Sequence, residues 1–289
     1  MKPAWSVVLF TTLAGAGQGL FLALVAGRAS GSFAAAGSAV SLFFLGGGLA
    51  ASFFHLGHPE RAWRSAAMWR TSWLSREVIL LPAFMAVVFA WGAAHYAGFP
   101  EEITFLIGMA GALLAVALYV CTAMIYACLR FLQEWHTPLT VVNYALLGTA
   151  SGLTLAAVLQ PSYVPAALLA GAVAYLMRIA SLARNARLRP RSTLASAIGV
   201  KHPGIAQIAQ GAMGGSFNTR EFFHGRPREA MRAVRWTFLA LLFPVPAALL
   251  FSGQETLAFA LQFAGLLAER WYFFAEARHP QNLYYQAIA

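Results

Sequence analysis

The stretch ITFLIGMAGALLAVALYVCTAMIYACL, residues Ile103–Leu129, contains no charged side chain. A helix needs about 20 mainly apolar residues to cross the hydrocarbon core of a bilayer. The stretch does not alternate between apolar and polar residues, as a strand of a membrane barrel does. A helix satisfies its own backbone hydrogen bonds inside a membrane, so this stretch predicts a transmembrane helix.

Similar apolar stretches recur along the whole chain, in which 60% of the residues are hydrophobic and only 10% are charged. The sequence therefore predicts an all-α fold, a single transmembrane domain (1–289) built as a polytopic helix bundle. We expect eight transmembrane helices, at about 5–26, 34–54, 78–97, 103–129, 140–160, 165–183, 236–252 and 256–275. The first stretch follows a single Lys2 and precedes no small-residue cleavage site, so we interpret it as a retained span.

Basic residues are distributed unevenly over the loops that this topology predicts. One side of the membrane collects 19 of the 20 Lys and Arg residues, and the other side has only Arg28. Because basic loops stay in the cytoplasm, both termini and the long basic loop 184–235 are predicted to be cytoplasmic. Topology and anionic lipid explain the net charge of +10, so we expect no nucleic-acid partner.

The few cysteines and histidines argue against a metal cofactor in this chain. Cys121 and Cys128 lie two helical turns apart in one apolar stretch, too far for a disulfide, and we interpret them as packing residues. Without a CxxC motif, we expect no Cys-ligated iron–sulfur cluster. His55 and His95 fall at opposite ends of their predicted helices, so we expect no haem held by two histidines.

Polar chemistry is concentrated in HLGHPERAWRSAAMWRTSWLSREV, residues His55–Val78, between the second and third predicted spans. His55 ends one span and Glu77 begins the next, with Arg64 and Arg76 close to them in sequence. Histidine titrates near neutral pH, and a half-buried glutamate can be tuned to do so. Arginine can stabilise a developing negative charge. This combination at the membrane rim suits the head group of a quinone, which takes up or releases two protons together with two electrons.

The same residues allow two other interpretations. Trp63, Trp69 and Trp73 suit a lipid interface, and charged residues at helix ends can act as simple caps, so the stretch could be a structural anchor. An ion or solute pathway is the other possibility, because ionisable residues in membrane helices mark such pathways as well. At the end of the last predicted span, we expect Glu269 and Arg270 to form a salt bridge at the rim or a docking contact for a partner.

The chain resembles the membrane-anchor subunits of dimethyl sulfoxide reductase, the DmsC-like family, over its whole length and span count. The most specific motifs are HLGHPERAW at 55–63 and WRTSWLSREV at 69–78. The segments FNTREFFHG at 217–225 and AERWYFFAEARHPQNLYYQ at 268–286 resemble the sulfite dehydrogenase (SoeC-type) branch of this family.

This resemblance implies a three-subunit oxidoreductase of anaerobic or sulfur respiration in the bacterial inner membrane. A catalytic subunit would carry a molybdenum bis-pterin cofactor, and a ferredoxin-like subunit would carry iron–sulfur clusters. The anchor would exchange electrons with menaquinone or ubiquinone without a haem of its own. Sulfite oxidation would reduce quinone, and a dimethyl sulfoxide-type reductase would oxidise quinol. We expect the ferredoxin-like partner to dock on the cytoplasmic side.

The resemblance also implies roles for individual residues. In the family, a histidine and a glutamate of this motif act at the quinol site, and they correspond to His55 and Glu77. These two residues would transfer protons to or from the quinone, and we expect His55, Arg64, Trp73, Arg76 and Glu77 to surround its head group. A secondary transporter is the rival from another class; it is disfavoured because the middle regions of the predicted spans are nearly free of charge and no internal repeat is evident.

Overall fold

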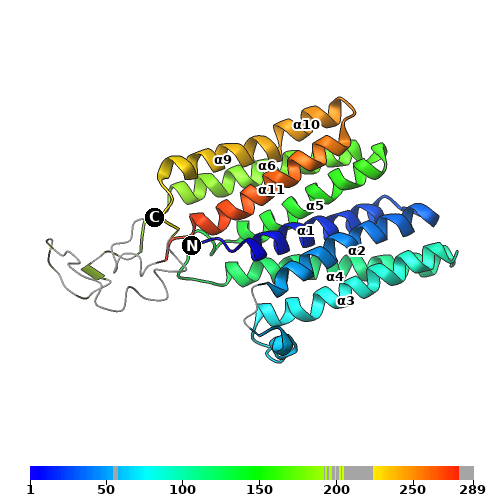
Figure 1. Ribbon diagram of the computed structural model, residues 1–289, viewed down its shortest axis with the longest axis horizontal. Coiled ribbons are helices and arrows are strands. Elements are labelled where there is room, and N and C mark those ends of the chain that lie inside the picture. The colour runs from blue at the N-terminus through cyan, green and yellow to red at the C-terminus, as the bar shows by residue number, and fades with distance from the viewer. Residues whose placement is uncertain are drawn as a thin grey trace.

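The computed structural model describes residues 1–54, 58–191 and 224–279, together with residues 193, 195–196, 199, 202 and 204. Within these residues the regular structure is entirely helical, and the long helices run side by side along one direction (Figure 1). The helices are α1 (Trp5–Ala26), α2 (Gly31–Phe53), η1 (Pro59–Ala66), α3 (Trp73–Tyr96), α4 (Glu101–Ala127), α5 (Pro138–Leu159), η2 (Pro161–Tyr163), α6 (Val164–Ala186), α9 (Arg228–Leu242), α10 (Pro244–Phe251) and α11 (Glu255–Glu276).

Seven segments of the described chain are long and apolar enough to cross a membrane. They are Trp5–Ala26, Gly31–Phe53, Trp73–Tyr96, Glu101–Ala127, Pro138–Leu159, Pro161–Ala186 and Arg228–Phe251. The last of these is interrupted at Phe243, where the backbone leaves the helical region directly before Pro244. Helix α11 has a comparable length and lies among the others, but its charged residues keep it outside this set, so the eighth span stays a prediction.

Helix α3 begins at Trp73, whereas the apolar pattern predicts a span that begins at 78. The earlier start has a local cause, because the Ser72 side chain caps the helix and accepts a hydrogen bond from the backbone N–H of Ser75 at 3.3 Å. Three polar residues between Trp73 and Val78 are therefore part of the helix. Glu77 lies one turn inside α3 instead of at its start.

Helices α1 and α5 form the closest contact of the bundle. A Cβ atom on Gly152 would lie only 2.0 Å from the carbonyl carbon of Gly19, and a Cβ on Gly19 would lie 2.1 Å from the carbonyl oxygen of Gly148. Small residues at these three positions allow the two backbones to touch, as in many membrane helix pairs. Most of the other helices pack around this pair, which places α1 and α5 at the centre of the molecule.

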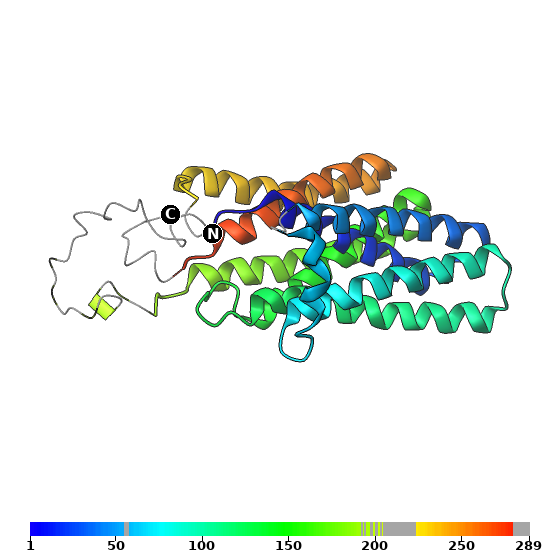
Figure 2. The same ribbon diagram turned by 60° about the horizontal axis from the view of Figure 1, so that its bottom comes forward.

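The two termini of the described chain meet at one end of the bundle, which we call the basic end (Figure 1). The amino group of Met1 donates a hydrogen bond to the carbonyl oxygen of Ala277 at 2.8 Å, and Arg184 donates to the carbonyl oxygen of Gln133 at 2.9 Å. The short helix η1 lies across the long helices next to the start of α3 (Figure 2). Half of the long loop predicted at 184–235 lies outside the described residues, including all of 205–223, and its two ends belong to α6 and α9.

Candidate functional site

Glu77 is a buried carboxyl group in the part of α3 nearest the basic end. Its exposed fraction is only 5%, and the Thr122 hydroxyl of α4 donates a hydrogen bond to its Oε1 atom. No cationic side chain forms an ion pair with Glu77 among the residues that the structure describes. The sequence predicts a half-buried glutamate at the start of its span, whereas the side chain is almost completely buried against α4, one turn inside the longer α3.

Arg76 and Trp73 lie together at the start of α3, on a different side of the helix from Glu77. The Arg76 guanidinium lies 4.2 Å from the centroid of the Trp73 ring. It also donates to the carbonyl oxygens of Trp69 at 2.9 Å and Arg70 at 2.8 Å. Arg76 therefore ties the loop that follows η1 to the first turn of α3, and holds a positive charge one residue from the buried carboxyl.

Arg64 lies in η1, apart from these residues. It is exposed, and its guanidinium lies 5.5 Å from the ring of Trp63, which is exposed as well. The structure gives Arg64 no contact with Glu77 or Arg76. The predicted group therefore divides into three parts: the buried carboxyl of Glu77, the half-buried pair of Arg76 and Trp73, and the exposed pair of Arg64 and Trp63. His55 lies outside the described residues, and its part in the site stays a prediction.

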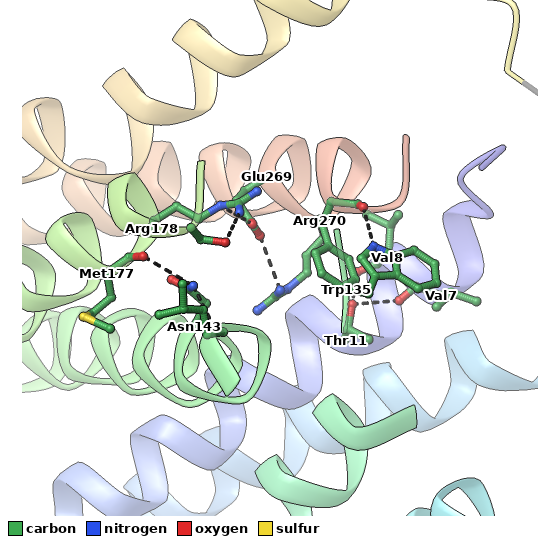
Figure 3. A network of polar contacts seen from close by, with 12 residues as sticks. Val7, Val8, Thr11, Trp135, Asn143, Met177, Arg178, Glu269 and Arg270 are labelled. Carbon is green, nitrogen blue, oxygen red and sulfur yellow. Dashed lines mark hydrogen bonds and ion pairs between the residues drawn. The ribbon is translucent and has the colours of Figure 1, made fainter. Parts of the chain in front are cut away.

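Glu269 and Arg270 form the predicted salt bridge inside a second buried polar group. Their side chains are only 1% and 3% exposed, so the bridge is buried among the helices instead of lying at an exposed rim. Glu269 lies between two arginines: Arg178 Nε of α6 is 2.9 Å from its Oε1, and Arg270 Nη1 is 3.4 Å from its Oε2 (Figure 3). We call Arg178, Glu269 and Arg270 the buried triad. Arg178, the third member, belongs to the predicted span 165–183.

Two tyrosines lie between Glu77 and the buried triad. The ring of Tyr126 stacks on that of Tyr144, with centroids 5.7 Å apart and planes inclined by 25°. The Arg270 guanidinium lies 3.8 Å from the centroid of the Tyr144 ring. Sequence reasoning did not find these tyrosines, because a tyrosine in an apolar helix gives no signal of its own. Arg178 could have been found, since an arginine within an apolar span is a functional hypothesis by default.

Ionisable groups at the basic end are partly withdrawn from water. Burial lowers the pKa of the Met1 amino group to about 5, and the nearby Glu134 carboxylate opposes this shift without cancelling it. Burial also lowers the pKa of His224 below its ordinary value, and the positive N-terminus adds to the effect. The pKa of His279 is lowered by the same two causes. This end therefore carries less positive charge than its sequence suggests.

The described residues contain cavities at both ends of the bundle. A cavity of about 640 Å³ lies at the end opposite the basic one, lined among others by Arg28, Gln160 and Tyr163. It includes none of the predicted site residues. A much smaller cavity of about 10 Å³ lies beside the buried triad. The described part of the chain has no group of three His, Cys, Asp or Glu side chains placed to hold a metal ion.

This all-helical arrangement, with its motif near the basic end, agrees with what comparison of the sequence shows. Residues 1–274 match the family described as DMSO reductase anchor subunit (DmsC), and the chain belongs to this family. A particular relative is a sulfite dehydrogenase subunit of Allochromatium vinosum, which is 53% identical over 325 aligned positions that cover both chains completely. The resemblance inferred from the two motifs is thereby confirmed, including its sulfite dehydrogenase branch.

Proposed function

We propose that this chain is the quinone-reactive membrane anchor of a sulfite-oxidising molybdoenzyme, in which it passes electrons from the iron–sulfur subunit to a membrane quinone. The full-length identity to a sulfite dehydrogenase subunit supports this function over that of a dimethyl sulfoxide-type reductase anchor. In the reductase, the same site would work in reverse and oxidise quinol.

The observation that carries the proposal is the buried, singly hydrogen-bonded carboxyl of Glu77 inside the family motif. A carboxyl group between two cations stays ionised, whereas one whose partner is a neutral hydroxyl can hold or release a proton. Glu77 has only Thr122 as such a partner among the described residues. This environment therefore suits a general acid or base, whereas the environment of a structural ion pair would not.

The residues around the start of α3 fit a quinone of either type, menaquinone or ubiquinone. Trp73 offers an aromatic face, and Arg76 a cation held in place by two backbone carbonyls. Met68 and Leu74, close to them in sequence, expose apolar surface, which suits an isoprenoid tail. A quinone held here would accept two electrons and two protons for each quinol formed. Glu77 and His55 would hold and deliver those protons, and Arg76 would stabilise the negative charge that precedes them.

The topology supports electron delivery at the basic end. With α11 as an eighth span, both described termini share one side of the membrane, and the basic residues of that side place it in the cytoplasm. The iron–sulfur subunit would dock on this end, close to the motif. The family model matches residues 1–274, which include the motif and all the predicted spans except the last residue of the eighth, and the relative aligns over the whole chain.

Two substitutions in the assembled complex test the proposal. His55→Ala and Glu77→Gln should each lower quinone-coupled turnover by about 100-fold, the usual contribution of a positioned acid or base. Turnover with an artificial dye, which receives electrons from the soluble subunits, measures how much complex has assembled. Glu60→Gln is the matched control, because Glu60 lies in the same segment but is exposed and contacts His58.

Full quinone-coupled turnover in both His55→Ala and Glu77→Gln would contradict the site assignment. A purely structural anchor would show that result for every variant. A transporter would retain solute flux after removal of the soluble subunits, whereas the proposed anchor has no activity without them.

A further inference from the structure

The cavity at the end of the bundle opposite the basic end has no part in the proposed quinone site. Its volume of about 640 Å³ lies within the range of about 300–1,000 Å³ that small-molecule pockets occupy. It is enclosed by the connection between α1 and α2 and the connection between α5 and α6, which both lie at this end (Figure 1). In the predicted topology this end faces the outer leaflet, at the level of the lipid head groups.

Arg28 supplies a positive charge to this cavity. It lines the cavity and is the one Lys or Arg that the predicted topology leaves on this side of the membrane. Among the described residues that line the cavity there is no Asp or Glu. Arg28 also has a φ of 51°, a conformation that glycine and asparagine adopt more readily than arginine. The turn itself therefore does not favour an arginine, and the guanidinium needs another explanation.

The start of α2 adds hydrogen-bond donors at the same place. This helix begins at Gly31, and the side chain of Ser30 before it makes no capping hydrogen bond. The first N–H groups of a helix have no partner within the helix, and its N-terminus has a partial positive charge. Ser30 and Phe33 from this end of α2 line the cavity. The helix terminus and Arg28 together therefore favour an anion in this space.

Tyr163 shows independently that the cavity lacks a ligand-like partner. Its side chain is only 9% exposed, and its hydroxyl makes no hydrogen bond within the described part of the chain. A Cβ atom on Gly27 would collide with this hydroxyl, and both residues line the cavity. Buried tyrosine hydroxyls usually have a hydrogen-bond partner, so an acceptor oxygen in the cavity would complete the site. Gln160 and Ser162 add polar side chains to the lining.

The size and lining of the cavity indicate which anion it takes. A free phosphate ion would fill only a small part of its volume, and Phe33, Leu153 and Ala166 line other parts of it with apolar surface. A phospholipid combines a phosphate with a glycerol group and acyl chains, and so suits both kinds of lining. One cation without a carboxylate in the lining favours a lipid with a net negative charge. A neutral quinone ring would leave the charge of Arg28 without a counter-ion.

We propose that this cavity binds the head group of an anionic phospholipid, such as phosphatidylglycerol, through its phosphate. Arg28 forms an ion pair with the phosphate, Tyr163 donates a hydrogen bond to it, and the first N–H groups of α2 face it. The bound lipid joins the connection between α1 and α2 with the connection between α5 and α6. This role is independent of the quinone chemistry, because the site lies at the other end of the bundle from Glu77.

Native mass spectrometry of the purified complex tests the proposal. The complex is delipidated in a neutral detergent and titrated with phosphatidylglycerol, and the peaks of the lipid-bound species give its dissociation constant. Arg28→Asn removes the charge and keeps a residue that tolerates positive φ, so it should weaken the tightest binding at least about tenfold. Lys2→Asn is the matched control, since it removes the same charge from an exposed position at the basic end and should leave this binding unchanged.

A second pair of variants tests the hydroxyl and decides the matter if Arg28→Asn fails to assemble. Tyr163→Phe keeps the ring and removes the donor, and should weaken the binding of phosphatidylglycerol about fivefold. Tyr96→Phe is its control, because this hydroxyl belongs to an exposed tyrosine at the end of α3 and should not contribute. Unchanged binding in both Arg28→Asn and Tyr163→Phe would overturn the proposal.

Two further titrations distinguish the sources of the phosphate. Phosphatidylcholine carries the same phosphate next to a positive group, so it should bind more weakly than phosphatidylglycerol. Inorganic phosphate, added to the complex loaded with phosphatidylglycerol, should not displace the lipid. Equal binding of the two lipids, or displacement by inorganic phosphate, would contradict the assignment of this cavity to an anionic phospholipid.

Discussion

Two buried glutamates lie near the basic end of the bundle, and their surroundings differ in one respect. Glu269 of α11 lies between Arg178 and Arg270, with the nearest nitrogen of each at 2.9 and 3.4 Å. Glu77 of α3 has the Thr122 hydroxyl as its hydrogen-bond partner. Both side chains are almost completely buried, so burial alone does not distinguish them.

Under the proposed function, one helix bundle would use the same side chain for two purposes, a structural one at Glu269 and a proton-transferring one at Glu77. Two arginines form ion pairs with Glu269, and the pair with Arg178 connects α6 with α11. The Thr122 hydroxyl is a neutral partner, so no opposite charge holds Glu77 in one protonation state, as the proposed proton-transfer role requires. The predictions below test this division, beginning with the largest effect.

Removing the charge of Glu269 should destabilise the chain most. Glu269→Gln leaves two buried arginines without their counter-ion, and breaking such a pair costs about 3–5 kcal/mol. Unfolding of the chain in mixed detergent micelles measures this loss. Glu102→Gln, the same change at an exposed position in the first turn of α4, is the control and should alter stability by less than about 1 kcal/mol. Equal stabilities of the two variants would show that the triad does not hold α11.

A double substitution should recover part of this loss. Arg178→Met combined with Glu269→Leu restores the net charge of the buried triad, because one positive and one negative group leave together. The double variant should be more stable than the sum of the two single variants predicts, by about 2 kcal/mol. The same unfolding measurement on all four chains gives this coupling energy, and a value near zero would mean that the two side chains act independently.

The Met1 amino group provides a third environment, in which a partly buried amino group donates a hydrogen bond to a backbone carbonyl. Its pKa is lowered from 8.0 to about 5, so between these values the unfolded chain binds a proton that the folded chain does not. Stability should therefore rise with pH over this window, by at most about 1.4 kcal/mol per pH unit. Thermal unfolding between pH 5 and 8 measures the slope. A chain with an acetylated amino group should lose this part of the pH dependence. An unchanged slope in the acetylated chain would show that the Met1 amino group is not its source.

The smallest effect on stability is expected at Glu77. In Glu77→Gln the amide has nearly the same shape, and its oxygen can still accept the Thr122 hydrogen bond, so the free energy of unfolding should change by less than about 1 kcal/mol. The free energies of unfolding of Glu77→Gln and Glu269→Gln, measured in the same series, give the difference between the two positions. A loss as large as that of Glu269→Gln would assign Glu77 to the structural framework and remove the basis for its proton-transfer role.

Several features could be predicted from the sequence because they depend on local patterns. Runs of apolar residues define helices and spans, since every backbone group in a bilayer must find its partner within the helix. The motif from His55 to Val78 identified the family, which the full-length comparison confirmed. The start of α3 was misplaced by five residues, because the apolar run begins later than the helix that Ser72 caps.

What only the tertiary structure decided is which polar side chains meet. Glu77 and Thr122 lie 45 residues apart in sequence, and Arg178 and Glu269 belong to different helices, so no local pattern connects them. Their contacts depend on how each helix is rotated about its axis, and on the glycines that bring α1 and α5 together. Hydropathy records how much of a helix is apolar, whereas the rotation of the helix decides whether a carboxyl faces two arginines or a hydroxyl.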